Sequence, residues 1–288
     1  MSNVTNNDII TGSTEILIQS LETNGNTSFT NDASSSNTIA GNGDITHSDT
    51  QSLFGGTSIS FDGNGDYLEL SNTVSLTYQN NFTIEFWRKP YNSNDVDDYE
   101  TFFSIGNFSF AFNDHYKSGP TSQLIYVYTT DWDFYNYFNT TNINEDDGPN
   151  YPNHSAWKHI ALVHDSTKTR GTRFSLYING KFIPPHNKTT SLSNITSATD
   201  FSVSGYPNFG RRILVNQYRY LHGYFDCFRF TRSIRYTSGF DPYVTAGPWI
   251  GNGTLTTSRS PVNKNYTNFY LAEKDFTGAN LTNAIFTN

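Results

Sequence analysis

The chain has 288 residues, of which 35% are hydrophobic and 15% charged, and its formal net charge at pH 7 is -8. This acidic balance, with no basic stripe, argues against nucleic acid as the main partner, because nucleic-acid binding needs clustered positive charge. Aromatic residues make up 16% of the chain and Leu, Ala, Glu and Lys are sparse, so the composition predicts an all-β protein.

The N-terminal part of the chain shows little pattern. Residues 1–14 are polar, and we expect a flexible arm. This segment lacks the basic start and apolar run of a secretory signal, and no later stretch is long and apolar enough to span a membrane. Residues 15–21 predict a first strand, whereas residues 22–52, rich in Ser, Asn, Thr and Gly, are expected to form a connection without strands.

The stretch FDGNGDYLEL carries oxygen-bearing side chains at alternate positions, namely Asp62, Asn64 and Asp66. A helix–loop–helix calcium site would need a Gly and a Glu further along, where this chain has Tyr and Thr. Because the residues on both sides alternate as in strands, we predict a hairpin turn here. Calcium at these three residues is a secondary hypothesis.

Short runs with strand periodicity follow in close succession. They predict strands at residues 82–87, 101–105, 108–112, 124–128, 157–164, 174–178, 201–204 and 223–230. Such a series, with turns between the runs and no helical segments, is typical of a β-sandwich or jelly roll.

Residues 129–156 interrupt this regularity and concentrate aromatic side chains beside an acidic, Pro-containing segment. Aromatic faces with amide and carboxylate groups nearby suit a sugar surface. We therefore predict carbohydrate binding by Trp132, Asp133, Tyr135 and Tyr137. The alternative is that half of the aromatic residues alternate into the core as one more strand.

Three other features predict no chemistry. Cys227 is the only cysteine, which excludes an intrachain disulfide, and we expect a buried small hydrophobic residue. His159 and His164 are an odd number of residues apart, so on one strand they face opposite sides and offer no zinc pair. The arginines between Arg229 and Arg235 are expected at a solvated strand edge.

The end of the chain has a different period. Residues 244–262 are expected to be a linker, and residues 263–288 form a separate tail. Within the tail, large apolar residues recur every five positions, at Tyr266, Leu271, Phe276, Leu281 and Phe286. This pattern resembles the pentapeptide-repeat family and implies a short β-helix-like tail that needs neighbouring repeats to bury its face.

An ordered set of motifs covers about residues 15–243. They are SLFGG with SISFDG (52–63), DYL (66–68), FTIEFW (82–87), WKHIALVHD (157–165), LYINGK (176–181), GYFDCFRFTR (223–232), and RYT followed by FDP (235–242). Together they resemble the laminin G-like branch of the concanavalin A-like lectin/glucanase superfamily, and the closing motif resembles versions from phage and other viral proteins. The resemblance implies a two-sheet antiparallel jelly roll.

The resemblance also bears on chemistry. Glucanases of the superfamily carry Glu-x-Asp-x-Glu on one strand, which this chain lacks, and acids such as Glu100 are expected to lie in solvated loops, so we expect no enzymatic activity. Laminin G-like domains often hold calcium at one end of the sandwich. Asp95, Asp97 and Asp98 are therefore a second candidate ligand set for calcium, the only cofactor considered.

We expect a non-enzymatic binding or adhesion module displayed on a virion, such as a phage or virus fibre, spike or capsid-decorating protein, that binds glycans on a host surface. Its other partners would be particle subunits, as a homo-oligomer, and it would reach the virion surface after assembly in a cytoplasm. The first alternative is a purely structural particle protein without sugar binding, and the second is a carbohydrate-binding appendage of a secreted hydrolase.

Overall fold

The computed structural model describes residues 14–33, 37–54, 56–91, 99–114, 123–129, 135–139, 157–169, 172–184, 201–212, 219–240 and 242. All elements with defined bounds in these ranges are strands, and all their pairings are antiparallel. In this part of the chain, no helix is both long and apolar enough to cross a membrane. The all-β prediction is confirmed.

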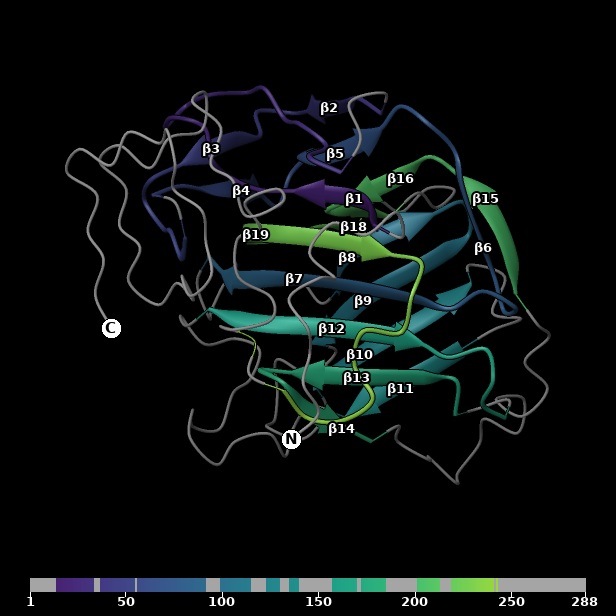
Figure 1. Cartoon of the computed structure of the whole chain (residues 1–288). Coiled ribbons are helices and arrows are strands. Elements are labelled where there is room, and N and C mark those ends of the chain that lie inside the picture. Colours follow the sequence, from purple (N-terminus) through teal and green to yellow (C-terminus); the bar gives the residue numbers. More distant parts are fainter. Residues whose placement is uncertain are drawn as a thin grey trace, which may run out of the picture.

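Two large sheets face each other to form a sandwich (Figure 1). The first sheet has the order β14 (Lys181–Ile183), β13 (Phe174–Ile178), β12 (Lys158–His164), β7 (Phe82–Pro90), β19 (His222–Thr231), β4 (Ser58–Asp62) and β3 (Thr46–Ser48), with β1 (Thr14–Ile18) also paired to β19. The second has the order β11 (Tyr135–Asn139), β10 (Gln123–Thr129), β9 (Phe108–Asp114), β8 (Tyr99–Ile105), β16 (Pro207–Phe209), β5 (Tyr67–Leu70) and β2 (Ile39–Asn42). Two small ribbons pair β6 (Val74–Thr77) with β15 (Ser202–Gly205), and β17 (Arg211–Arg212) with β18 (Arg219–Tyr220).

The strand β19 organises the first sheet. Along one side it pairs with β7, and along the other side it pairs first with β4 and then with β1. The register shifts between Asp226 and Arg229, where Cys227 has a φ of 50°, so a bulge separates the two halves of the strand. Cys227 is 1% exposed, which confirms the prediction of a buried residue.

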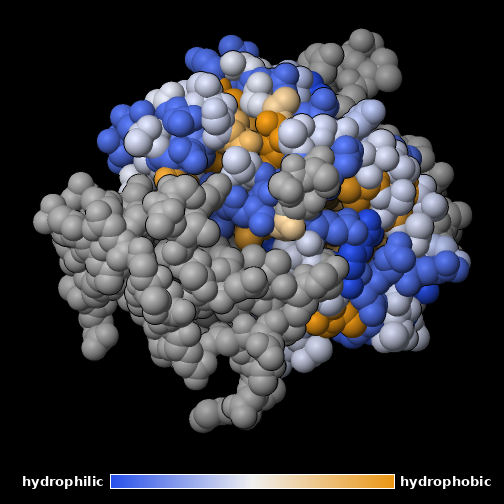
Figure 2. Space-filling view, turned by 45° about the horizontal axis from the view of Figure 1, so that its top comes forward, coloured by the Kyte–Doolittle hydropathy of each residue, from blue (hydrophilic) through white to orange (hydrophobic). Residues whose placement is uncertain are grey.

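The space between the sheets is filled mainly by aromatic and aliphatic side chains, with phenylalanine the commonest. The ring of Phe86 on β7 stacks on Phe225 of β19, with centroids 4.6 Å apart. It also contacts the ring of Phe102 on β8, with centroids 5.1 Å apart, so the rings bridge the two layers. On the face shown in Figure 2, outside its grey area, hydrophobic residues reach the surface in small patches between hydrophilic ones. Burial of aromatic faces from both sheets explains why strand periodicity dominates the sequence.

Three sequence predictions need correction. Residues 22–52 contain two strands, β2 and β3, which are short and polar but are held by their pairing with β5 and β4. The turn after β4 is not a hairpin, because β4 and β5 belong to different sheets. Residues 135–139, inside the predicted irregular stretch, form β11 with Phe138 buried in the core, which agrees with the alternative of one more strand.

The predicted boundaries fall mostly on residues that the structure does not describe. The arm up to residue 13, the linker and the tail that resembles pentapeptide repeats lie outside the described ranges. Those assignments stay predictions.

Candidate binding surface at one corner of the sandwich

The tetrapeptide Gly-Asn-Gly-Asp occurs twice, at residues 41–44 and 63–66. Each copy turns the chain from one sheet into the other, the first between β2 and β3 and the second between β4 and β5. Since β2 pairs with β5 and β3 pairs with β4, the two turns lie side by side. Gly63 and Gly65 have φ values of 84° and 95°, which side chains other than glycine rarely adopt.

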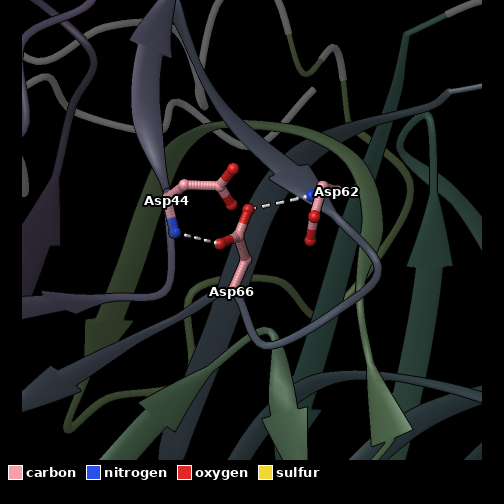
Figure 3. A group of neighbouring side chains, drawn as sticks. All are labelled: Asp44, Asp62 and Asp66. Carbon is pink, nitrogen blue, oxygen red and sulfur yellow. Dashed lines mark hydrogen bonds between the residues drawn. The ribbon is translucent and has the colours of Figure 1, made fainter.

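Asp66 joins the two turns (Figure 3). Its Oδ1 accepts a hydrogen bond from the backbone amide of Asp44 at 2.9 Å, and its Oδ2 accepts one from the amide of Asp62 at 3.0 Å. Asp66 is 2% exposed, whereas Asp44 and Asp62 are exposed. Burial, with a contribution from the charge of Asp62, raises the pKa of Asp66 to about 6.

The carboxylates of Asp44, Asp62 and Asp66 offer oxygens within 4.8 Å of one another. Carboxylate oxygens are ligands for hard cations such as Ca²⁺, and the buried Asp66 with two exposed carboxylates beside it fits such an ion. Asn64 has a different part in the turn, because its backbone amide donates to Oδ1 of Asp62 at 2.7 Å. The predicted ligands Asp62 and Asp66 therefore come together. Asp44 was not predicted, although the repeated tetrapeptide is a signal for it.

Aromatic side chains that were not predicted as site residues stack next to this corner. The ring of Tyr91 is stacked on His222, with centroids 5.0 Å apart and planes 15° apart, and on Tyr224, at 5.3 Å and 11°. Tyr91 is 53% exposed and Tyr224 is buried. Burial and a hydrogen bond with Tyr91 raise the pKa of Tyr224 to about 12. A signal was available, since Tyr91 follows one predicted strand and His222 precedes another.

The other predicted site residues are not tested. Trp132 and Asp133 lie outside the described residues, as do Asp95, Asp97 and Asp98. The remaining two are in β11, where the backbone pairs Tyr135 with Tyr128 and Tyr137 with Tyr126 of β10. Carbohydrate binding by these residues stays a prediction.

Glu100 is not in a solvated loop as predicted. It lies in β8, is fully buried and pairs with Arg88 of β7. The surrounding rings of Phe102 and Phe112 also face the Arg88 guanidinium. Glu100 is thus an internal acid whose charge is balanced by an arginine, because an unpaired buried carboxylate would be far too costly.

Two of the three arginines near the end of β19 are also not at a solvated edge, whereas Arg232 is partly exposed. Arg229 is fully buried and its side chain contacts Glu85 of β7 at 2.6 Å, while Arg235 approaches the same carboxylate at 2.8 Å. Tyr236 donates its hydroxyl hydrogen to the other oxygen of Glu85 at 2.5 Å. Burial would raise the pKa of Glu85, but the two guanidinium groups outweigh it and hold the pKa below its usual range.

The two histidines of β12 do face opposite sides, as predicted. His159 lies near Glu85 on the outer face of the first sheet, and His164 stacks on Phe82 inside the sandwich at 4.9 Å. They cannot share a ligand.

The sequence of this two-sheet domain matches a known family. The laminin G family model of the concanavalin A-like lectin/glucanases superfamily matches residues 62–235. The chain belongs to this superfamily. No curated protein sequence matches the chain.

The chain is also similar to several domains of solved structure. The binding domain of Paraclostridial Mosquitocidal Protein 1 is 12% identical with a TM-score of 0.54, over 77% of this chain and 49% of that chain. The binding domain of botulinum neurotoxin serotype D is 12% identical with a TM-score of 0.49, over 77% and 48%. Domain 4 of an extracellular arabinanase from Geobacillus stearothermophilus, solved with arabinotriose, is 14% identical with a TM-score of 0.47, over 77% and 93%.

The superfamily member described here spans about half the length of the two toxin binding domains. At these identities the likeness to the mosquitocidal protein shows the fold alone. The function must be argued from the side chains of this chain.

Proposed function

We propose that this chain is a non-enzymatic module that binds glycans. The superfamily description names lectins and glucanases, and these two activities need different side chains. The observation that carries the proposal is the enclosure of the acids in the central strands, because it favours binding over hydrolysis.

Glycoside hydrolysis uses two carboxylates on either side of the bond to be cleaved, about 5–10 Å apart and open to the substrate. In the described strands, Glu85 and Glu100 are fully buried and contact arginines, and Asp226 is 2% exposed. Solvent reaches the strand acids Glu15 and Glu69, each paired with an arginine, and Asp62 at the end of β4. Acids enclosed like Glu85 cannot reach a polysaccharide. Their placement supports binding without cleavage.

The aromatic side chains support a glycan as the ligand. Rings on a rigid β-scaffold offer flat apolar faces that pack against the C–H faces of sugars, and polar groups around them select the hydroxyl pattern. Among the described residues, Tyr91 just after β7 is 53% exposed. The predicted residues Trp132 and Tyr135 extend the set of candidate ring contacts.

A glycan array probed with the full chain tests this function. We expect retention on a subset of glycans and no release of reducing sugar from any glycan retained. Failure to retain any glycan would contradict the proposed binding, and sugar release that disappears in Glu100→Gln would contradict the absence of catalysis.

We further propose calcium as a ligand of Asp44, Asp62 and Asp66. The support is the gathering of their carboxylate oxygens within 4.8 Å. A bound Ca²⁺ would supply positive charge between the two corner turns. We expect added calcium to raise the melting temperature of the chain and EDTA to reverse the increase; an unchanged melting temperature, with Asp44→Asn as control, would contradict the proposal.

The place of action that we propose is the surface of a virion, as a homo-oligomer. The support is the resemblance of the closing motif to viral versions. In this chain, Tyr236 and Phe240 of that motif stack with ring centroids 3.6 Å apart and cover the outer face of the first sheet. Antibody labelling of intact particles and sedimentation of the purified chain test this. A monomer found only with a secreted hydrolase would contradict it, and particles that carry the chain without glycan binding would favour a purely structural role.

A further inference from the structure

The stacked rings beside the corner turns lie on three neighbouring strands. In the register of the first sheet, His222 of β19 pairs with Asp62 of β4, and Gly223 pairs with Pro90 of β7. Tyr91, the residue after Pro90, is therefore opposite His222. Paired residues lie on the same face of a sheet, so the rings and the Asp62 carboxylate belong to one surface. We call Tyr91, His222, Tyr224 and Asp62 the corner surface.

Gly223 brings the end of β7 close to β19. Its φ is 143°, and a Cβ at this position would lie 3.2 Å from the amide nitrogen of Tyr91 and would collide with the carbonyl of Lys89. Any other residue would therefore push Tyr91 away from His222 and Tyr224. The local backbone is shaped so that the rings can stack.

The stack fixes the orientation of an exposed ring. An isolated surface tyrosine samples several rotamers and loses this freedom when a ligand binds. Tyr91 is 53% exposed but already contacts two rings nearly parallel to its own. A ligand that packs on it meets a preorganised surface and loses less entropy on binding.

The charge around the rings selects among ligands. The carboxylates of Asp44 and Asp66 lie within 4.8 Å of that of Asp62, and the amine of Lys89 is in contact with the side chain of Gln51. Three carboxylates outweigh even one bound divalent cation. Carboxylate oxygens accept hydrogen bonds from sugar hydroxyls, while they repel a carboxylate or sulfate on a ligand.

We propose that the corner surface binds an uncharged pyranose residue, which packs on Tyr91 and donates hydroxyl hydrogen bonds to Asp62, and that it rejects anionic glycans. This inference rests on the proposed glycan-binding function. It names the site and the class of sugar.

Tyr91→Ala and Tyr206→Ala make a matched pair for the test, since both tyrosines are 53% exposed and Tyr206 lies on the turn between β15 and β16. The full-length variants are applied to an array in which each neutral oligosaccharide is printed beside its sialylated counterpart. We expect Tyr91→Ala to lower the affinity for the retained neutral glycans by about tenfold, in line with the loss of one aromatic contact. Tyr206→Ala should leave this affinity unchanged. Tyr91→Phe keeps the ring and should retain binding, and circular dichroism confirms the fold of each variant.

The array also tests the charge argument. Wild type should retain neutral glycans and not their sialylated counterparts, and the double variant Asp44→Asn with Asp62→Asn should gain retention of the sialylated ones by about threefold or more, since like charges repel.

The outcomes separate this inference from the proposed function. If wild type retains glycans and Trp132→Ala abolishes the retention while a folded Tyr91→Ala keeps it, the corner surface is wrong and the function stands. If wild type retains only sialylated glycans, the sugar class is wrong. If wild type retains no glycan, both the function and the corner surface are overturned.

Discussion

Asp226 shows how one buried group can make the whole domain sensitive to pH. Its Oδ1 accepts hydrogen bonds from the amides of Cys227 at 2.8 Å and Ser20 at 3.3 Å, so the side chain links the bulge of β19 to the segment after β1. Burial raises its pKa from 3.8 to about 7. The folded state therefore holds a proton on Asp226 at pH values where the unfolded chain has released it.

The free energy of unfolding should therefore fall as the pH rises. Because the folded pKa of Asp226 is above the unfolded value, its contribution to stability is fully present below pH 4 and is lost as the pH rises towards 7. We expect stability to fall between pH 5 and 8 by on the order of 2 kcal/mol from this group. Asp226→Asn, which resembles the protonated acid, should have a flatter profile in urea unfolding monitored at pH 5, 6, 7 and 8. A variant with the slope of wild type would rule out Asp226 as the source.

At the scale of elements, polar side chains connect strands and turns that are far apart in the sequence. Asp66 holds two corner turns together through two backbone amides. Glu85 of β7 contacts Arg229 of β19 and the segment that follows it. Both acids are enclosed, since Asp66 is 2% and Glu85 0% exposed, and each accepts a hydrogen bond from a group on another segment.

Removing the Asp66 carboxylate, which both corner turns share as a hydrogen-bond acceptor, should destabilise the folded chain. In Asp66→Ala the amides of Asp44 and Asp62 lose their partner, and each unsatisfied donor costs about 1–3 kcal/mol. We expect a loss of about 2–4 kcal/mol in the free energy of unfolding. Asn64→Ala in the same turn is the control, and equal losses in the two variants would show that the turn tolerates no substitution at all.

The contact between Glu85 and the arginines gives a second prediction at this scale. Glu85→Gln leaves the buried guanidinium groups of Arg229 and Arg235 without a countercharge, and breaking a buried ion pair from one side costs about 3–5 kcal/mol. The control is Glu69→Gln, because Glu69 is 37% exposed and pairs with Arg211 at 3.5 Å. That change should cost less than about 1 kcal/mol. If denaturant unfolding shows similar losses of stability for Glu85→Gln and Glu69→Gln, burial does not set the cost of breaking these ion pairs.

At the scale of the whole molecule, the strands were predictable and their partners were not. Runs such as residues 82–87 show their period locally, because alternate residues face the aromatic core. The strands β2 and β3 escaped notice since their residues are polar, and only pairing with β5 and β4 makes them strands. Arg229 looked solvated in the sequence because its partner Glu85 is 144 residues away.

The corner surface shows the same limit of sequence-based prediction. Asp62 and Asp66 are close in sequence and were found together, but Asp44 and Tyr91 join them only through the register of two sheets. The aromatic stretch around Trp132 was selected by composition, which indicates sugar binding without giving a geometry. The sequence therefore predicts the fold and two of the three acids at the corner.

The topology also predicts slow folding. The strand β1 pairs with β19 more than two hundred residues later, as in Thr14 with Thr231, and such distant pairings are entropically costly to form. We expect refolding on a scale of about 10 ms to 10 s, followed by stopped-flow fluorescence of the buried Trp87. A complete recovery within about 1 ms would contradict this.

The pairing of the first strand with the last one has a mechanical consequence. Thr14 and Thr231 are paired neighbours. A force that pulls these two residues apart would separate β1 from β19 one hydrogen bond at a time, and a sheet resists such a force only weakly. The segment after β19 prevents this, because the amide of Phe240 donates to the carbonyl of Gly180 at 3.1 Å and its ring stacks on Tyr236. A pull on the C-terminal side is therefore borne first by these contacts on the outer face, and the pair of strands beneath stays unloaded until they give way.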